Sequence, residues 1–404
     1  MKKKDVPAFG PLQGIRVLSV GSAVAGPYVG SLMADFGATV LQVESSVGPD
    51  VSRVNSKGGI EQERRNELMI NLNIPSAEGK EIIRKLLKET DIFVENGKGG
   101  QYAKWGLTDD VLWEANPKLI ICHVSGFGQY GAPGYITRGA WDAIGQAFGG
   151  YTALNGEPDG LPTPAAPLTG DYMAGLHAAW ACLAAYVNML RTGEGESIDC
   201  AQFETVAKAQ YGYCTDQWNF GVLRSPGGAK GPTGIAGWGP YRCKDGRFIY
   251  CCFNGIGAYR KGLKVIGLTY GGETFPEGTM TSFIGTPNGD LVEQAVIRFC
   301  SEHTAAEADR ILSESGVPVS EIMDSSSMET NAHYKARNVV VEWENTSGQT
   351  IKGIKIVPEL SKKPGRIWRG AARYGEDNDD ILQELGYTEA EIRSLREKKV
   401  ISNP

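Results

Sequence analysis

The sequence predicts an α/β fold with two parts: a large parallel-sheet domain formed from both ends of the chain, and a smaller α/β domain in the middle. Three observations support this prediction. Apolar strand-like runs alternate with helical runs from Gly14 onwards, and these strand-like runs lead into glycine-rich loops. The composition then shifts toward glycine, proline and aromatic residues between Trp218 and Gly239. Alternating strands and helices are typical of a parallel sheet.

The chain has 404 residues, which is long enough for two domains. The predicted boundaries follow the composition shift and the return of helical patterns near the C-terminus. They assign residues 1–224 to the first part of the large domain, 225–330 to the small domain and 331–404 to a segment that completes the large domain.

The composition is that of an ordinary globular protein, with 41% hydrophobic and 22% charged residues. A net charge of −6 gives no general basic field, so nucleic acid is not expected as a partner. The longest apolar run, Leu176–Leu190, contains a histidine and an asparagine, and the basic N-terminus lacks the apolar segment of a signal peptide. We therefore expect a cytoplasmic protein without a membrane partner.

The cysteines and histidines do not form a metal-binding pattern. Eight cysteines are scattered without a Cys-x-x-Cys pair, and the four histidines are not spaced with a cysteine pair. Several cysteines lie in apolar runs, which is typical of buried free thiols. No metal site is predicted.

The N-terminal segment predicts a β–turn–α–β unit. A strand at Gly14–Val20 leads into a glycine-rich turn and a helix that ends near Phe36, and a second strand at Ala38–Val43 ends at Glu44. A glycine-rich turn before a helix resembles a dinucleotide site. The spacing is not G-x-G-x-x-G, so the turn fits another nucleotide-like ligand at least as well as NAD. The glycines concerned are Gly21, Gly26 and Gly30.

Two further strands end in glycine-rich loops. These strands are Ile92–Val94 and Leu119–Val124, with helices expected at Ser76–Thr90 and from Asp109 to Trp113. Loops at the carboxyl edge of a parallel sheet commonly bind ligands. Four cations lie in or near these loops and together suit a ligand that carries phosphates, although each alone fits an ordinary surface charge. They are Lys57, Lys98, Lys104 and Arg138.

A long helix is predicted after Asp171. Apolar residues recur there at spacings of three and four. Asp171 lies at or just before the first turn, where a carboxylate is favoured, so one interpretation is a helix cap. The other is a functional carboxylate. The recurring residues are Met173, Leu176, Trp180, Leu183, Ala184, Val187 and Leu190.

The remaining elements divide between the two domains. A further helix is expected to start at Asp199, and a glycine-rich turn at residues 234–239 leads into the strands of the small domain. The other predicted elements are strands at Tyr241–Cys243 and Phe248–Phe253, helices at Leu291–Ser301 and Ala305–Ser315, and the returning segments Ile354–Pro358, Asp379–Leu385 and Thr388–Lys398.

In this order, these segments resemble the class III CoA-transferases, the superfamily of carnitine CoA-transferase, formyl-CoA:oxalate transferase and α-methylacyl-CoA racemase. The resemblance covers nearly the whole chain. It rests on Pro11–Leu18, Ala25–Pro27, Asp35–Val40, Gly126–Gly131, Gly170–Gly175 and Thr192–Asp199.

The resemblance implies a Rossmann-like large domain, a small middle domain and a homodimer of two interlinked rings. It places the nucleophilic aspartate of the family at Asp171, by its Gly-Asp-x-x-x-Gly setting, and CoA contacts at Lys98 and Lys104. Some relatives have a second basic residue where this chain has Trp105. Coenzyme A is then used as an acyl-CoA substrate, and no metal is required. A glycine loop that shields the intermediates from water corresponds to Gly234, Gly237 and Gly239.

In the chemistry that the resemblance implies, a carboxylate attacks an acyl-CoA thioester and forms an acyl-aspartyl anhydride. The released thiolate then converts this anhydride into an aspartyl-CoA thioester, which the second acid resolves. A racemase would need a base and an acid on either side of the α-carbon. Racemases of the superfamily have a histidine where this chain has Trp141, so a transferase is favoured. A non-catalytic CoA-binding subunit is less consistent with Asp171.

The acid substrate is predicted from the branch of the family. Ser125–Gly131 and Lys363–Gly370 resemble the L-carnitine CoA-transferase branch most. The predicted reaction therefore moves CoA from crotonobetainyl-CoA or γ-butyrobetainyl-CoA to L-carnitine, and a 2-hydroxy acid of amino-acid fermentation is the alternative acceptor. A trimethylammonium acid favours an aromatic enclosure. The aromatic candidates are Tyr211, Tyr213, Trp218, Trp238 and Tyr241.

Overall fold

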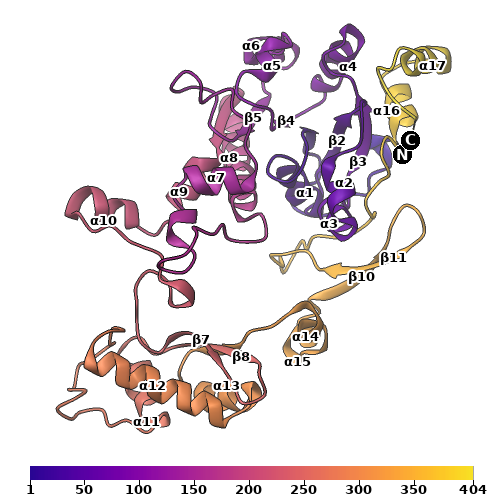
Figure 1. Cartoon of the computed structure of the whole chain (residues 1–404). Coiled ribbons are helices and arrows are strands. Elements are labelled where there is room, and N and C mark those ends of the chain that lie inside the picture. The colour runs from indigo at the N-terminus through magenta and orange to yellow at the C-terminus, as the bar shows by residue number, and fades with distance from the viewer. Residues whose placement is uncertain (404) are drawn as a thin grey trace. The chain divides into compact units, whose positions relative to one another are not determined.

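The computed structural model describes residues 1–403, which form two compact units (Figure 1). The first unit contains residues 1–150, 165–210 and 335–404, and the second contains residues 151–164 and 211–334. The compact units therefore change at Tyr211 and Lys335, whereas the composition places domain boundaries at 225 and 331. Residues 151–164 belong to the second unit, where the Gly228 N–H donates to the Gly156 carbonyl at 3.0 Å.

The first unit is built on a six-stranded sheet in the order β3-β2-β1-β4-β5-β6. All neighbouring strands are parallel, so the predicted α/β fold with a large parallel sheet is confirmed. The strand order reverses between β1 and β4, which is where ligands commonly bind in such sheets. The strands are β1 (Arg16–Val20), β2 (Thr39–Ser45), β3 (Leu68–Leu72), β4 (Ile92–Glu95), β5 (Ile120–Ser125) and β6 (Glu196–Ala201).

Helices cover both faces of this sheet (Figure 1). A hairpin of two antiparallel strands, β10 (Val340–Glu344) and β11 (Thr350–Ile354), belongs to the same unit. The helices are η1 (Lys3–Asp5), α1 (Pro27–Asp35), α2 (Val51–Asn55), α3 (Lys57–Glu63), α4 (Ala77–Leu87), α5 (Gln101–Lys104), α6 (Asp109–Ala115), α7 (Asp142–Phe148), α8 (Thr169–Thr192), α9 (Gln202–Lys208), α16 (Asn378–Glu384) and α17 (Glu389–Glu397).

Each face of the sheet has its own apolar core. Successive side chains of a strand point to opposite faces. In β1, Leu18 therefore packs with α4, α16 and α17, whereas Val17 packs with α1 and α8. Because both faces are covered, the central strands are buried along almost their whole length.

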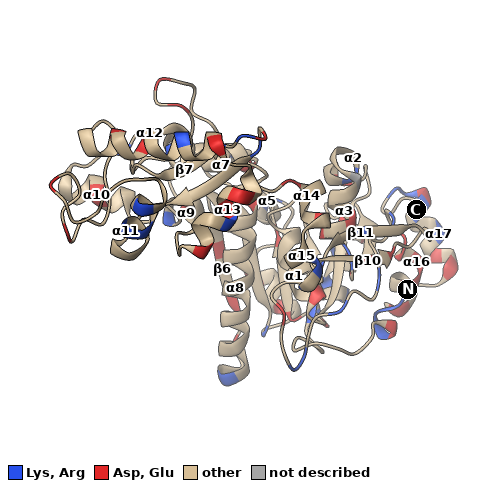
Figure 2. Ribbon diagram, turned by 90° about the horizontal axis from the view of Figure 1, so that it is seen from below, with Lys and Arg blue, Asp and Glu red and all other residues tan. Residues whose placement is uncertain are grey.

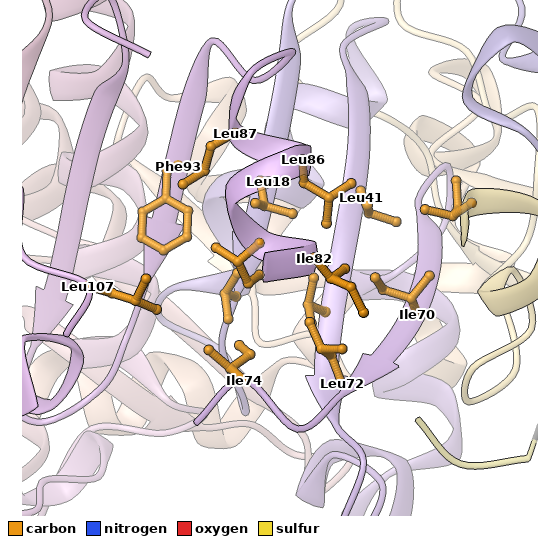
Figure 3. Packing of buried hydrophobic residues seen from close by; sticks show 14 of the residues in the cluster. Leu18, Leu41, Ile70, Leu72, Ile74, Ile82, Leu86, Leu87, Phe93 and Leu107 are labelled. Carbon is orange, nitrogen blue, oxygen red and sulfur yellow. The ribbon is translucent and has the colours of Figure 1, made fainter. Parts of the chain in front are cut away.

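Helix α4 shows how the sequence forms one of these faces (Figure 3). The Ser76 hydroxyl accepts from the Gly79 N–H at 2.9 Å and caps the helix N-terminus. Four apolar residues at helical spacing then lie against the sheet, all of them almost fully buried. They are Ile82, Ile83, Leu86 and Leu87.

In helix α8, unlike α4, mainly small residues face the sheet, not large ones. Its small residues Ala174, Ala178 and Cys182 are buried against the sheet, whereas Trp180 is 73% exposed and Leu190 is 66% exposed. In Figure 2 the helix is mostly without charged residues along its length. By length and composition alone it would be able to cross a membrane, and 33% of its most apolar stretch is buried. Of the large apolar residues that predict this helix, Leu183 packs partly buried against this core, whereas Leu176, Trp180, Val187 and Leu190 are exposed.

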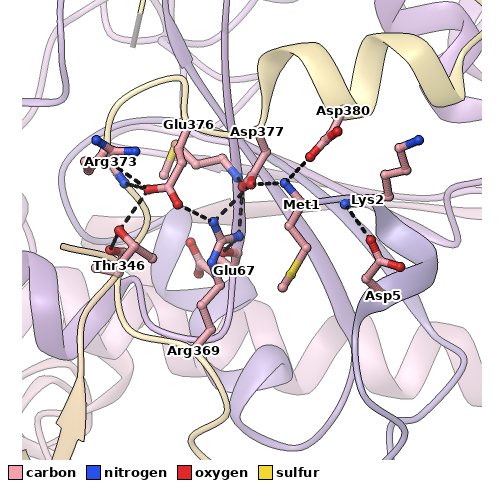
Figure 4. A network of polar contacts seen from close by, with 12 residues as sticks. Met1, Lys2, Asp5, Glu67, Thr346, Arg369, Arg373, Glu376, Asp377 and Asp380 are labelled. Carbon is pink, nitrogen blue, oxygen red and sulfur yellow. Dashed lines mark hydrogen bonds and ion pairs between the residues drawn. The ribbon is translucent and has the colours of Figure 1, made fainter. Parts of the chain in front are cut away.

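The C-terminal segment covers the outer edge of β3. The Met69 N–H donates to the Asp377 carboxylate at 2.7 Å, and the Asn71 N–H donates to the Asn378 side chain at 3.0 Å. Arg369 donates to both carboxylate oxygens of Asp377, at 2.8 and 3.0 Å, and to Glu376 at 2.9 Å (Figure 4). These side chains satisfy edge groups of β3 that have no neighbouring strand.

The second unit contains a three-stranded antiparallel sheet in the order β7-β8-β9. Helices α11, α12 and α13 contribute apolar residues to one core around Ile249 and Phe253. The elements are η2 (Thr152–Leu154), α10 (Tyr213–Phe220), η3 (Gly228–Lys230), β7 (Trp238–Arg242), β8 (Phe248–Cys252), α11 (Ile256–Val265), α12 (Pro287–Glu302), α13 (Ala305–Glu314), β9 (Val319–Glu321), α14 (Ser325–Thr330) and, at the change of unit, α15 (Ala332–Ala336).

Two strands of the large sheet differ from the prediction. No strand was expected at β3. The helix expected to start at Asp199 is present but begins at Gln202, because Asp199 lies inside β6. The β6 pattern is short and only its last two residues are buried, so its period of two is weak.

Candidate active site

A cavity of about 560 Å³ lies at the carboxyl edge of the parallel sheet. The segments that follow β1 to β5 line it, together with the first residues of α8 and α9. All of these segments belong to the first unit. Asp171 and Gln202 form part of the wall.

Asp171 lies in the first turn of α8 and is only 6% exposed. The helix N-cap is Leu168, which has a left-handed backbone (φ +48°) and no side-chain cap bond. The interpretation of Asp171 as the helix cap is therefore wrong. The Asp171 N–H itself donates to Asp142 Oδ1 at 3.0 Å, so the Asp142 carboxylate satisfies one of the free N–H groups of the first turn.

Asp142 is held in place from its other side. Its Oδ2 accepts from Gln146 Nε2 at 2.6 Å, and the same Gln146 amide exchanges hydrogen bonds with the backbone of Ala165. Asp142 is 7% exposed and is the first residue of α7. The segment just before α8 is thus tied to α7 through one buried glutamine.

Gln202 contacts the Asp171 carboxylate directly. Its Nε2 donates a hydrogen bond to Asp171 Oδ1, and Gln202 is 4% exposed. A Cβ atom at Gly145 would lie 2.2 Å from Gln202 Oε1, so the glycine leaves room for this side chain. Among residues 1–403, no hydrogen bond engages Asp171 Oδ2.

The environment of Asp171 favours its neutral form. Burial raises the pKa of the carboxyl, the nearby Asp142 raises it further, and the hydrogen bond from Gln202 lowers it, with a resulting pKa of about 7. In the described part of the chain neither Asp171 nor Asp142 forms an ion pair. A carboxylate without a cationic partner is weakly stabilised and well suited to attack a carbonyl group.

The turn after β1 is held by side chains from other elements. Asn96 binds both the N–H and the carbonyl of Ser22, at 3.0 and 2.7 Å, and Asp50 accepts from the Ala23 N–H. Arg64, which is buried, donates to the Ala23 carbonyl. Cβ atoms at Gly21 or Gly26 would lie 2.3 and 2.7 Å from Asn96. These two glycines therefore make room for Asn96.

Of the four predicted cations, two line the cavity with Asp171, and the side chain of Lys57 lies outside the described part of the structure. Lys98 follows β4 and lies against Gly139, where an added Cβ would be 3.4 Å from its Cε, and Arg138 stacks on Tyr135 at 3.8 Å. Lys104 is exposed on α5 and is not among the lining residues, whereas the neighbouring Trp105 is. Within the described chain Lys98 and Lys104 have no carboxylate partner, so both are available to an anion.

A buried histidine supports the loop that carries Lys98. His123 lies between Glu95, at 2.6 Å, and Asp109, at 3.0 Å. Burial lowers the pKa of His123, but the hydrogen bonds with Asp109 and Glu95 outweigh it and raise the pKa to about 10. Glu95 in turn accepts from the Gly97 N–H, next to Lys98. The two carboxylates thus favour the charged imidazole, which ties Asp109 to Glu95 at the base of this loop.

The three glycines predicted to form a shielding loop lie in the second unit and all have positive φ. Gly239 lies inside β7 and is not part of a loop. Gly234 and Gly237 flank a short bridge from Ile235 to Phe283, and the Gly237 N–H donates to Glu293 at 2.7 Å. Their role at the site stays a prediction.

Sequence reasoning did not find Asp142, Gln202 or Asn96 as site residues. Asn96 and Gln202 directly follow the strands β4 and β6. The rule that the carboxyl ends of parallel strands face the ligand would have found Gln202 if β6 had been recognised. In residues 1–403, no group of three or more His, Cys, Asp or Glu side chains is arranged to hold a metal ion.

Comparisons with known proteins give one family. A family model described as CoA-transferase family III matches residues 12–378. The bile acid CoA-transferase BaiK of Clostridium scindens is 40% identical over 409 residues, which cover 99% of this chain and 91% of that protein.

Solved structures have the same fold. A CAIB/BAIF family protein from Brucella suis is 25% identical, with a TM-score of 0.79 over 93% of this chain and 100% of that chain. Rv3272 from M. tuberculosis is 21% identical, with a TM-score of 0.78 over 92% of this chain and 99% of that chain.

Proposed function

Because the chain belongs to CoA-transferase family III and is a CoA-transferase, we propose that Asp171 is the nucleophile that carries the acyl group and then CoA. The observation behind this proposal is a buried carboxyl that has no cationic partner, keeps one oxygen free and faces a cavity at the carboxyl edge of the sheet. A carboxylate in this position is accessible to a thioester and poorly solvated by water.

The proposed reaction begins when Asp171 Oδ2 attacks the carbonyl carbon of the acyl-CoA. CoA leaves as a thiolate, and an acyl-aspartyl anhydride remains. The thiolate then attacks Asp171 Cγ, which breaks the bond to Oδ2 and releases the first acid with that oxygen. The second acid attacks the resulting aspartyl-CoA thioester, and the same two steps in reverse give the new acyl-CoA and regenerate the carboxylate.

Lys98 and Arg138 are the proposed contacts for the CoA phosphates. Both line the cavity that contains Asp171, and cations at the carboxyl edge of such a sheet suit a phosphate-bearing ligand. Lys104, the third predicted contact, lies outside the lining residues. We therefore expect it to contribute less.

The acid substrate has two candidates. Similarity to a bile acid CoA-transferase over 99% of the chain favours a steroid carboxylic acid. L-carnitine remains the proposal from the family branch, but its aromatic candidates are poorly placed for a cation: Tyr211 is 92% exposed, and the Tyr241 ring is already covered by Lys230 at 3.5 Å. We rank the steroid acid first.

An acid panel separates these candidates. The enzyme is supplied with the CoA thioester of each acid in turn, and transfer to a steroid acid, L-carnitine or a 2-hydroxy acid is followed by mass spectrometry. A kcat/KM for carnitine that is a hundredfold above that for the steroid acid would reverse our ranking.

The covalent step is tested by trapping. Incubation with acyl-CoA and no acceptor should add the mass of the acyl group or of CoA to the peptide that contains Asp171, and hydroxylamine should convert that residue into a hydroxamate. The same peptide of the Asp171→Asn protein should stay unmodified. A modified peptide elsewhere, with Asp171 untouched, would contradict the proposal.

We also propose that the protein is a homodimer. Large apolar residues of α8 are exposed, with Leu176 at 52%, Trp180 at 73% and Leu190 at 66%, and a second copy would cover them. The interlinked form of the dimer rests on the family resemblance. Light scattering should give about twice the mass of the chain, and a stable monomer would contradict this. The cytoplasmic location stays a prediction.

A racemase is disfavoured by the composition of the cavity. Trp141 lines it where superfamily racemases have a histidine, and no histidine occurs among its described lining residues. Deuterium exchange at the α-carbon of a 2-methylacyl-CoA would reveal a racemase.

A further inference from the structure

We propose that Gln202 is a catalytic residue whose side-chain amide stabilises the oxyanion that forms on Asp171 when CoA attacks the aspartyl carbonyl carbon. The inference rests on the proposed role of Asp171 and extends it to the group that stabilises its intermediates.

The two oxygens of Asp171 have different surroundings. Gln202 Nε2 donates to Oδ1, whereas Oδ2 has no hydrogen bond among the described residues. Both Gln202 and Asp171 line the cavity and both are almost fully buried. This arrangement assigns Oδ2 to the attack on the acyl group. Oδ1 stays hydrogen-bonded to Gln202 Nε2 through all steps of the reaction.

Gln202 is also held rigidly. It follows β6, where Ala201 pairs with Ser125 of β5, and it is the first residue of α9. Its carbonyl accepts from the Thr205 hydroxyl at 2.8 Å, and its side chain fills the space that Gly145 leaves open. A donor that does not have to reorganise is most effective at stabilising developing charge.

The electron flow places that charge on Oδ1. When the thiolate forms a C–S bond to Asp171 Cγ, the carbonyl electron pair moves to Oδ1, and the oxyanion then collapses by expelling the acyl carboxylate with Oδ2. The attack of the second acid on the aspartyl-CoA thioester also places the charge on Oδ1. In the steps at the acyl carbonyl, by contrast, the oxyanion lies on the substrate. Gln202 therefore acts in the two steps that occur at Asp171 Cγ.

The test compares two buried glutamines. Gln202→Met keeps the volume and removes the donor, and Gln210→Met is the matched control, because Gln210 is 7% exposed and donates to the Gly149 carbonyl instead of Asp171. We expect kcat to fall about 10²- to 10³-fold for Gln202→Met, the size of effect seen when one oxyanion donor is removed. The KM for acyl-CoA and the activity of Gln210→Met should change less than threefold.

The intermediates supply a readout that a structural role would not move. After a rapid quench with acyl-CoA, intact-protein mass spectrometry gives the ratio of acyl adduct to CoA adduct. This ratio should rise at least tenfold in Gln202→Met, because the attack of the thiolate on Asp171 Cγ is slowed, whereas the attack of Asp171 on the acyl-CoA, with its oxyanion on the substrate, is not. If Gln202→Met does not fold, Gln202→Asn, whose amide is one bond too short to reach Oδ1, should show the same pattern.

The pH dependence gives an independent measure. Burial and Asp142 raise the pKa of Asp171 to about 7, and the Gln202 hydrogen bond lowers it, so its loss should move the ascending limb of the pH–rate profile to higher pH.

Two results would overturn the inference: a kcat within threefold of the wild type, or an unchanged adduct ratio. Asp171→Asn is measured in parallel. If it is inactive while Gln202→Met keeps its kcat, only the role of Gln202 fails. If it is active, the proposed nucleophile fails as well.

Discussion

Two buried carboxylate clusters in the first unit have opposite electrostatics. Asp171 and Asp142 lie close together with amide partners and no cation, and the pKa of Asp171 is raised to about 7, chiefly by burial. Glu376 and Asp377 instead share Arg369. Burial alone would raise the pKa of Glu376, but hydrogen bonds from the Arg373 backbone, Thr346 and Arg369 outweigh it and lower the pKa.

The difference separates reactivity from stability. The Arg369 cluster joins β3 to the C-terminal segment and stabilises the folded chain (Figure 4). The Asp171 cluster costs stability when it is ionised, and under the proposed function this cost would be the source of the reactivity of Asp171. Such a trade-off between stability and activity is common at functional sites.

The largest expected effect is on catalysis. Asp171→Asn should reduce kcat by about 10⁴-fold or more, because an amide cannot form the anhydride. Steady-state assays of protein that is checked by mass spectrometry for deamidation back to aspartate measure this. An active, fully amidated variant would contradict the role of the first cluster.

A substitution in the Arg369 cluster should lower the stability of the protein and leave its activity unchanged. Arg369→Met removes the cation that the two carboxylates share, while Asp377 keeps the N-terminal ammonium at 2.7 Å and Glu376 keeps Arg373 at 3.4 Å. We therefore expect the free energy of unfolding to fall by about 3 kcal/mol. Urea unfolding measures the loss, and the kcat of the folded fraction should be unchanged. The control is Arg310→Met, which breaks the exposed pair with Glu314 and should cost at most about 0.5 kcal/mol. Equal losses in the two variants would remove the distinction between the clusters.

The pH dependence of stability sharpens the contrast. The folded pKa of Asp171, about 7, lies above the unfolded value of 3.8, so its contribution to stability is full below pH 3.8 and is lost as the pH rises through 7. Asp171→Asn removes this loss. The quantity to compare is the free energy of unfolding of Asp171→Asn minus that of the wild type. This difference should be about 2–4 kcal/mol larger at pH 8 than at pH 4. A difference that does not vary with pH would argue against a raised pKa.

The smallest effect is expected at Lys98, the proposed phosphate contact, which lines the cavity and forms no ion pair with Asp171. Lys98→Ala should raise the KM for acyl-CoA about tenfold, which corresponds to about 1.4 kcal/mol, and leave the pH profile unchanged. With an acyl-pantetheine substrate, which lacks all of the CoA phosphates, the effect should disappear. Lys104→Ala is the matched control, and an equal effect there would show that CoA extends beyond the cavity described.

The sequence predicted the parts of the fold with strong local patterns. Helix α4 follows its apolar spacing, and the buried strands β1, β2, β4 and β5 lie close to their predicted positions. Helix α8 was predicted from its large apolar residues, but small residues form its buried face, because close packing against the sheet favours residues such as Ala174 and Ala178. Periodicity alone does not reveal which of two apolar faces packs inside.

For the candidate site, too, the sequence indicated the residues that follow a local pattern and missed those that depend on packing. Asp171, Lys98 and Arg138 lie around one cavity, as strand ends followed by glycine-rich loops suggest. Asp142 and Gln202 are far from Asp171 along the chain and contact it only in the folded state. Their hydrogen bonds depend on how α7, α8 and α9 pack, which no local pattern encodes.

The covering of β3 by the C-terminal segment has a consequence for synthesis. Met69 and Asp377 are 308 positions apart, so the strand leaves the ribosome long before the residues that satisfy its edge. At about 5–20 residues per second, the interval is about 15–60 s. During this time the nascent chain can hold an apolar strand with an unpaired edge, which is a template for aggregation. Yield in a cell should therefore depend on chaperones that bind nascent chains and on slow, cool expression more strongly than the stability of the finished protein suggests.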